Sequence, residues 1–209
     1  SRLGIAGEDG PGVSGATAWI ERLKLESGFG LDGVARAVVI GGGNTAIDAA
    51  RELARLGVPS VRMLYRRTRA EMSGYAHEMD QGRLEGVTLV ERAVPQGFER
   101  DAGGRLAGVR LADGRVEPCD LALIAIGQAS LGALATRFPG VTVDGRGQVV
   151  ADATTGRTAH PKVFAGGDLL SGGDLVVTAV QEGKRAARGI CAALGVAVRP
   201  DSPMNAGRV

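Results

Sequence analysis

Residues 38–50 read VVIGGGNTAIDAA, and this stretch decides the fold. The apolar run 37–40 predicts a short buried strand, and residues 45–56 repeat their apolar side chains at helical spacing. Gly57 follows at the position where a glycine commonly ends a helix. Residues 61–65 then predict a second strand. Together these segments predict a strand–turn–helix–strand unit of about 30 residues.

Three small residues, Gly41, Gly43 and Ala46, fit the pattern G-x-G-x-x-A between the strand and the helix. The first permits a tight turn, the second lets the backbone approach a pyrophosphate, and the third lets helix and strand pack closely. The free N–H groups of the helix would then face the phosphates. A glycine-rich turn without a ligand is the alternative. The predicted nucleotide contacts are Gly41, Gly42, Gly43, Asn44, Thr45 and Ala46.

The second strand carries no acidic residue at its end, where a site for NAD usually has one to hold the ribose 2′-hydroxyl. It ends instead in Tyr65-Arg66-Arg67-Thr68-Arg69. Guanidinium groups can pair with the 2′-phosphate of NADP, which a carboxylate would repel. Arg66 and Arg67 are the predicted contacts and Arg69 is a weaker third. A solvated cationic turn is the alternative interpretation.

The rest of the chain predicts an α/β fold with a Rossmann-like parallel sheet. The turn sequences DAGG and ADG lie between short predicted strands and predict an antiparallel β-meander. The run DLALIAI at 120–126 predicts a strand buried on both faces. The other predicted elements are helices at 14–26 and 75–86, a strand at 87–90, meander strands near 93–100, 105–112 and 115–118, a strand at 162–165, and a long helix from 176 to 194.

Five segments resemble the glutamate synthase small subunit family and the flavin–NADPH half of dihydropyrimidine dehydrogenase. They are RLGIAGED, VVIGGGNTAIDAAR, LYRRTRAEM, LALIAIGQ and VFAGGD followed by VVTAVQEGKRAA, in the family's order. The resemblance implies a two-dinucleotide flavoprotein that moves a hydride from NADPH to FAD. Electrons would then pass to iron–sulfur clusters or to a partner subunit.

The resemblance also implies roles for residues late in the chain. Ile126 and Gly127 would lie where the chain crosses from the nicotinamide domain back to the FAD domain. Asp168, after Gly167, would accept hydrogen bonds from a ribityl hydroxyl. The helix that begins near Val176 and Val177 would face the flavin pyrimidine carbonyl, where its positive end suits the charge of reduced flavin.

The sequence departs from that family in three ways. It lacks the N-terminal FAD-binding part with a second G-x-G-x-x-G, it lacks a cysteine-rich iron–sulfur region, and Ser73 replaces a common proline. We therefore expect a piece of a larger enzyme that does not retain FAD by itself. Its expected partner is the missing FAD and iron–sulfur part or a partner subunit. A homodimer formed through the apolar stripe of the last helix is the alternative.

The predicted domains are a connecting segment at 1–12, an NADP(H)-binding domain at 13–127, the C-terminal portion of a FAD-binding domain at 128–197 and a tail at 198–209. A non-catalytic NADP(H)-binding or partner-docking module is the competing interpretation. A self-contained NADP dehydrogenase is weaker, because neither a substrate domain nor a proton-transfer residue is found. No catalytic residue is predicted, since hydride transfer between two cofactor rings requires their alignment.

Composition excludes several classes. A net charge of +2 among 209 residues is too mild for a nucleic-acid-binding stripe. Cys119 and Cys191 form no CxxC pair, and His77 and His160 stand far apart, so no metal site is expected. No signal peptide or long apolar span is recognisable, which predicts a cytoplasmic protein without a membrane partner.

Overall fold

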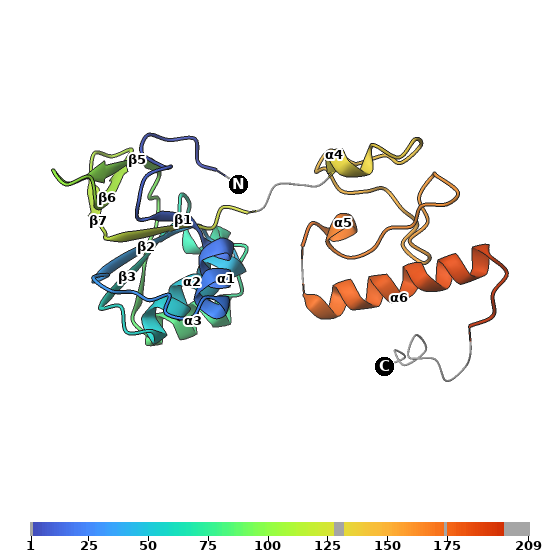
Figure 1. Ribbon diagram of the computed structural model, residues 1–209, viewed down its shortest axis with the longest axis horizontal. Coiled ribbons are helices and arrows are strands. Elements are labelled where there is room, and N and C mark those ends of the chain that lie inside the picture. The colour runs from blue at the N-terminus through green and yellow to red at the C-terminus, as the bar shows by residue number, and fades with distance from the viewer. Residues whose placement is uncertain (1, 128–131, 174, 199–209) are drawn as a thin grey trace. The chain divides into compact units, whose positions relative to one another are not determined.

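The computed structural model describes residues 2–127, 132–173 and 175–198. The chain divides into two compact units, Ser1–Gln128 and Ala129–Val209 (Figure 1). Each unit is considered by itself. The first contains the predicted dinucleotide turn, and the second contains the late FAD-like segment.

The first unit is built on a five-stranded sheet in which every strand pairs in parallel with its neighbours. Its order is β1-β8-β2-β3-β4, so the chain leaves β2 toward β3 and returns through β8 on the other side. Ligands in such sheets lie at the carboxyl ends of the strands where the order reverses. The strands are β1 (Val13–Gly15), β2 (Arg36–Ile40), β3 (Ser60–Leu64), β4 (Val87–Val90) and β8 (Leu121–Ile124).

Two different layers cover the faces of this sheet (Figure 1). Three helices lie on one face: α1 (Ala16–Leu25), α2 (Asn44–Arg55) and α3 (Ala76–Leu84), with a 3₁₀ turn, η1 (Arg69–Glu71), before α3. An antiparallel sheet lies on the other: β5 (Pro95–Arg100), β6 (Leu106–Leu111) and β7 (Val116–Pro118). The predicted α/β class, with a parallel sheet and a meander, is confirmed.

The side chains of β2 point alternately to the two faces of the sheet and so contribute to two hydrophobic cores of the first unit. Ala37 and Val39 pack with the helices, whereas Val38 and Ile40 pack with the meander. Because successive side chains of a strand point to opposite faces, one apolar run serves both layers. Cys119 belongs to the meander-side core, where burial raises the pKa of its thiol to about 12. This cysteine is therefore an inert core residue rather than a nucleophile.

A buried ion pair joins the two sheets. Glu117 of β7 is 6% exposed and its Oε2 accepts a hydrogen bond from Arg62 Nη1 of β3 at 2.5 Å. Arg115 adds a second, longer contact of 4.0 Å. A carboxylate at this depth needs such a partner, because burying an unpaired charge is costly.

The N-terminal segment is fastened to the meander before it reaches β1. Phe98 donates its backbone N–H to the Ala6 carbonyl at 2.9 Å. The Arg100 guanidinium donates to the carbonyl oxygens of Pro11 at 2.7 Å and Gly7 at 3.1 Å, and also to that of Gly104 within the meander. The expected connecting segment therefore has specific anchors to the first unit.

The second unit contains three helices among its described residues: α4 (Gly132–Ala135), α5 (Asp168–Ser171) and α6 (Val176–Ala193). Its small core consists of Val141, Val149 and Ala165. α6 lies close to the loop that contains Thr155. A Cβ on Gly189 of α6 would stand only 2.3 Å from the Thr155 carbonyl oxygen.

Several elements differ from the sequence prediction, which lacked the short helical segments η1, α4 and α5. A short strand, β1, occupies the residues just before α1, and three residues without alternation give no period-2 signal. The predicted strand at 162–165 is wrong, since only one antiparallel bridge, between Phe164 and Arg157, forms there. The neighbouring segment turns at Gly156, whose φ is +68°, so it cannot extend the ladder.

We expect Glu117→Ala to destabilise the first unit by about 1.5–3 kcal/mol, because it leaves Arg62 without its acceptor. Denaturant unfolding followed through the single tryptophan, Trp19 of α1, measures this unit. The matched control is Glu99→Ala, which breaks an exposed pair with Arg110 in the same meander and should cost less than about 1 kcal/mol. Equal costs for the two substitutions would contradict the cross-sheet role of Glu117.

Candidate functional site

The glycine turn lies at the carboxyl end of β2, beside the end of β8. Gly41 has a φ of +151°, and a Cβ on it would stand 2.3 Å from the Ala125 carbonyl oxygen. A Cβ on Gly42 would stand 2.4 Å from the ring of Tyr65. The first two glycines are therefore required by the packing of the protein itself.

Gly43 is different, because nothing in the protein requires a glycine there. Its φ of −94° suits any residue, and a Cβ would meet only Ser73 Oγ, at an ordinary 3.5 Å. The open space beside this backbone lies at the first turn of α2, for which Gly43 is the N-cap. This is the position at which a dinucleotide turn must admit a pyrophosphate.

The N-terminus of α2 is free to bind an anion. No side chain caps it, so its first N–H groups keep their hydrogen-bonding capacity and the positive end of the helix dipole. Ala46 is fully buried against the sheet, as its place in the motif predicts, and Thr45 is exposed. Asn44 instead uses its side chain internally, accepting the Tyr75 N–H at Oδ1 at 2.8 Å.

The segment from Ser73 to Tyr75 supports the turn from its outer side. Gly74 donates its N–H to the Gly42 carbonyl at 3.0 Å, and a Cβ on Gly74 would strike Ile47 at 2.5 Å. Sequence reasoning did not identify this support. Its only signal is the pair of small residues at 73–74, in the position where the resembling family has a proline.

The predicted arginines follow β3 on a loop at the same edge of the sheet. Arg66 and Arg67 are exposed, and neither forms an ion pair with another residue in the described part of the chain. Arg69, the weaker third candidate, is bonded to Asp80 and is therefore already neutralised.

A capping box shapes this arginine loop. Glu71 accepts hydrogen bonds from the Thr68 N–H at 3.1 Å and from Thr68 Oγ1 at 2.8 Å. These bonds, and the nearby charges of Arg67 and Arg92, hold the pKa of the Glu71 carboxyl below its usual range. The pattern Thr68-x-x-Glu71 is a recognisable sequence signal for a capping box, but the sequence analysis did not identify it.

Ile126 and Gly127 lie just beyond β8, at the edge that also carries Gly41. Ala125 donates its N–H to the Ile40 carbonyl at 2.8 Å, which joins the two strand ends. Gly127 has a φ of +101°, a conformation that suits glycine, and Ile126 is partly exposed. The structure thus brings together the glycine turn and the end of β8 at one edge of the first unit.

In the second unit, Gly167 precedes α5 with φ +69° and ψ −148°, a backbone region that essentially only glycine adopts. A Cβ there would lie 3.6 Å from Ala179 of α6. Asp168 is exposed and begins α5. Val176 and Val177 form the uncapped first turn of α6 and are 79% and 71% exposed.

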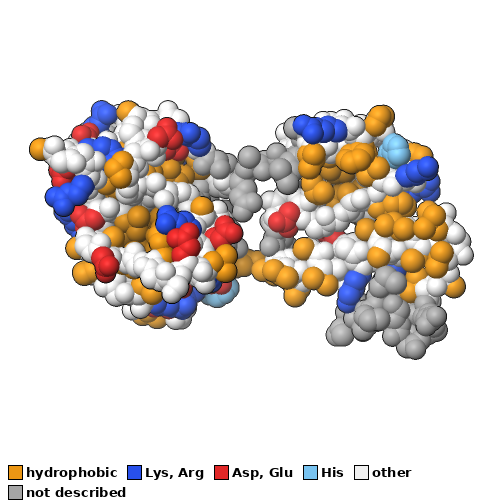
Figure 2. Space-filling view, in the orientation of Figure 1, with side chains coloured by type: hydrophobic (Ala, Val, Ile, Leu, Met, Phe, Trp, Pro, Cys, Tyr) orange, Lys and Arg blue, Asp and Glu red, His pale blue; other side chains and the backbone are white. Residues whose placement is uncertain are grey.

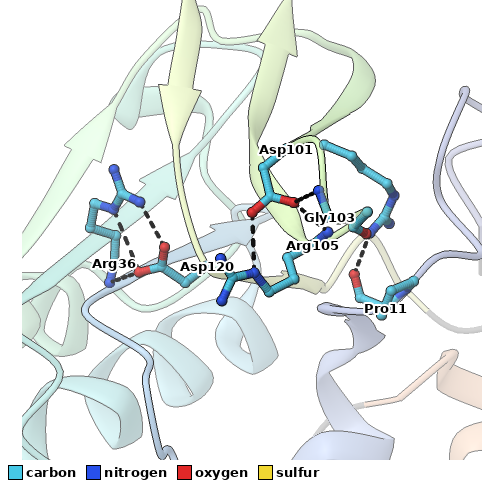
Figure 3. A network of polar contacts seen from close by, with 8 residues as sticks. Pro11, Arg36, Asp101, Gly103, Arg105 and Asp120 are labelled. Atoms are coloured by element: carbon cyan, nitrogen blue, oxygen red, sulfur yellow. Dashed lines mark hydrogen bonds and ion pairs between the residues drawn. The ribbon is translucent and has the colours of Figure 1, made fainter.

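The opposite, amino-terminal edge of the first sheet holds a cleft of about 520 Å³, and both arginines that line it are paired with aspartates. Arg36 bonds Asp120 at 2.7 Å, and Asp101 accepts from Arg105 and Gly103 (Figure 3). These contacts hold the pKa values of both aspartates below the ordinary value. Within the described residues there is no group of three or more metal-ligating side chains and no helix long and apolar enough to cross a membrane.

A glycine turn at the switch point of a parallel sheet is the arrangement typical of dinucleotide-binding proteins of the α/β class. The family model for pyridine nucleotide-disulphide oxidoreductases matches residues 2–183, and the chain belongs to this family.

The chain is similar in sequence to curated proteins that include glutamate synthase small chains. It is 33% identical to the glutamate synthase [NADPH] small chain of Escherichia coli, covering 90% of this chain and 47% of that one. It is 35% identical to the putative oxidoreductase AegA of the same organism, covering 93% of this chain and 34% of that one. The predicted family resemblance is confirmed. The chain spans about half or less of the length of these relatives.

Solved structures agree on the fold. Thioredoxin reductase of T. acidophilum superposes with a TM-score of 0.75 at 25% identity, over 92% of this chain and 62% of that one. A FAD-dependent pyridine nucleotide-disulphide oxidoreductase of Desulfovibrio vulgaris gives a TM-score of 0.68 at 22% identity, over 92% and 51%.

We expect Gly43→Val to leave the fold intact and to weaken NADPH binding by tenfold or more, because the side chain would fill the open space at the turn. Gly42→Ala is the matched comparison: its Cβ would strike Tyr65 and should destabilise the first unit by roughly 1–3 kcal/mol. Calorimetric titration and thermal melting separate the two effects. Unchanged NADPH affinity in folded Gly43→Val would contradict the site.

Proposed function

We propose that this chain is the NADPH-binding portion of a flavin-dependent oxidoreductase that transfers a hydride from NADPH to FAD and on to an iron–sulfur or partner acceptor. Its family is one of pyridine nucleotide oxidoreductases, and one solved relative is described as FAD-dependent. The single observation that carries the proposal is Gly43, where the protein leaves open space that its own packing does not need.

The nucleotide fits the groups that surround this space. The pyrophosphate would lie against Gly43 and the uncapped N-terminus of α2. The loop after β3 offers the unpaired guanidinium groups of Arg66 and Arg67 to a 2′-phosphate. The residues directly after β3, where a site for NAD usually has an acid for the ribose 2′-hydroxyl, include none here, which favours NADP(H) over NAD(H).

The second unit fits part of a FAD site. When bound, the nicotinamide and the flavin would supply the hydride-transfer chemistry themselves. The exposed Asp168 could accept a hydrogen bond from a ribityl hydroxyl, and Gly167 gives the backbone before it the conformation that glycine favours. The uncapped start of α6, at Val176 and Val177, would face the pyrimidine carbonyl.

Several groups of the second unit point to a further covering segment or subunit. Among the described residues, Glu182 Oε2 and Arg188 Nε are buried without a hydrogen-bond partner. Phe164 directs its N–H and carbonyl away from its single bridge with Arg157. Hydrophobic side chains also gather along α6 (Figure 2); the exposed ones include Val176, Val177, Val180, Ile190 and Leu194. The rest of a FAD-binding domain, a partner subunit or a second copy would cover these exposed apolar side chains.

We expect NADPH to bind the chain more tightly than NADH. Arg66→Ala combined with Arg67→Ala should remove most of this preference, since each charge-assisted contact contributes roughly 1.5–3 kcal/mol. Calorimetric titration of both nucleotides measures the affinity ratio. Arg105→Ala, at the opposite edge of the sheet, is the matched control and should keep the preference. Equal affinity for NADH in the unaltered chain would reject the assignment.

We expect the purified chain to hold no stoichiometric FAD. Asp168 and the start of α6 could orient a flavin, but contacts of orientation alone rarely offset the entropy of association. The absorbance spectrum in the flavin bands, with and without added FAD after gel filtration, provides the measurement. A yellow protein with one FAD per chain would show that these residues bind the flavin unaided.

A further inference from the structure

Arg92 has an unusual backbone. It is the only non-glycine residue with a positive φ, +53°, in the described part of the chain. A Cβ strains this left-handed conformation, which glycine adopts freely and asparagine tolerates better than most residues. Such outliers persist where the surrounding structure imposes them, and they cluster at functional sites.

Arg92 lies at the carboxyl end of β4, next to the arginine loop that follows β3. Its N–H donates to the Arg67 carbonyl at 3.0 Å, and the next residue, Ala93, donates to the Tyr65 carbonyl at 2.9 Å. Tyr65 in turn donates to the Val90 carbonyl at 3.0 Å. These three backbone bonds fasten the turn at Arg92 to the loop on which Arg66 and Arg67 stand.

Besides the carboxylates of Glu71 and Glu91, which accept hydrogen bonds from the loop at Thr68 and at the Arg69 N–H, this corner carries three guanidinium groups. Arg66, Arg67 and Arg92 are all exposed, and none forms an ion pair with a residue that the structure describes. After the hydrogen bonds from Thr68, the charges of Arg67 and Arg92 both help to lower the pKa of the Glu71 carboxyl. Glu71 already accepts two hydrogen bonds from Thr68 and leaves the arginines available.

We propose that Arg92, from the neighbouring strand, is a third guanidinium that holds the 2′-phosphate of NADP(H) and so contributes to nucleotide choice. The juxtaposition of its strained turn with the loop of Arg66 and Arg67 carries this inference, which rests on the proposed NADPH site. In parallel sheets the carboxyl ends of adjacent strands wall the same ligand crevice, so a residue ending β4 can reach a group held at the end of β3.

A purely structural role makes a different prediction. If Arg92 served only to balance Glu71 and stabilise the loop, its removal would lower the melting temperature or weaken all nucleotides equally. A phosphate contact would instead change binding only of ligands that carry the 2′-phosphate. The ratio of affinities therefore separates the two roles.

The test uses the full chain with Arg92→Asn and Arg92→Gly, which both tolerate the positive φ, and with Arg105→Asn as the control at the opposite edge. NADPH, NADH, adenosine 2′,5′-bisphosphate and AMP are titrated by calorimetry. We expect both Arg92 variants to bind NADPH and the bisphosphate about tenfold more weakly, with NADH and AMP unchanged. Arg92→Lys, which keeps the charge without the planar fork, should recover part of the loss.

Thermal melting shows that each variant is folded, and Arg92→Gly should melt no lower than the unaltered chain. Both Arg92 variants could keep the preference for NADPH while the double variant Arg66→Ala with Arg67→Ala loses it. This outcome would overturn the role of Arg92 alone. An unaltered chain without any preference for NADPH overturns both this inference and the proposed function. Equal weakening of all four ligands also overturns the role of Arg92 as a phosphate contact.

Discussion

The close approach of β2 and β8 at their carboxyl ends is the constraint on which the first unit depends. Gly41 passes so near the Ala125 carbonyl that no side chain fits between them, and Ala46 packs against the same point. This contact sets the exit of the chain from β2 and therefore the direction in which α2 begins. The free N–H groups of α2, the open space beside Gly43 and the crevice between the strands all follow from it.

The three glycines of the turn have separate physical reasons, which a motif alone does not distinguish. Gly41 is required by backbone conformation and the neighbouring strand, and Gly42 by the ring of Tyr65. Gly43 is required by neither. The open space at Gly43 lies at the start of α2, where a dinucleotide turn admits a pyrophosphate, and this position is what gives it weight in the proposed function. Gly43 therefore says more about function than Gly41 and Gly42, which the packing of the protein itself requires to be glycine.

Much of the first unit could be predicted because its signals are local and strong. The run before Gly41 is apolar on both faces, and turn residues separate the meander strands. The hydrophobic pattern and the turn residues were therefore enough to predict these strands. β1 could not be predicted, because three residues carry no period and its pairing with β8 joins positions 13 and 122. Arg92 was missed for a related reason: its proximity to Arg67 is made by adjacent strands, and its backbone angle has no sequence signature.

The second unit was harder to predict, since short segments there depend on long-range partners. The apolar run around Phe164 looks like a strand, but a strand needs a ladder, and only one bridge forms among the described residues. The helix from Val176 to Ala193 was predicted correctly because its period is internal. Its exposed apolar side chains show that a helix can be specified by its own sequence while its packing depends on something else.

The attachment of residues 6–11 to the meander has a mechanical consequence. β1 is a three-residue edge strand that pairs only with β8, and such a strand would peel easily if tension reached it directly. Beyond the local contacts of residues 2–4 with Glu8 and Asp9, tension applied at Arg2 meets the bond from Phe98 to Ala6 and the contacts of Arg100 with Gly7 and Pro11. The load therefore passes into the meander. The short pairing of β1 with β8 is thereby shielded from a pull on the N-terminal segment.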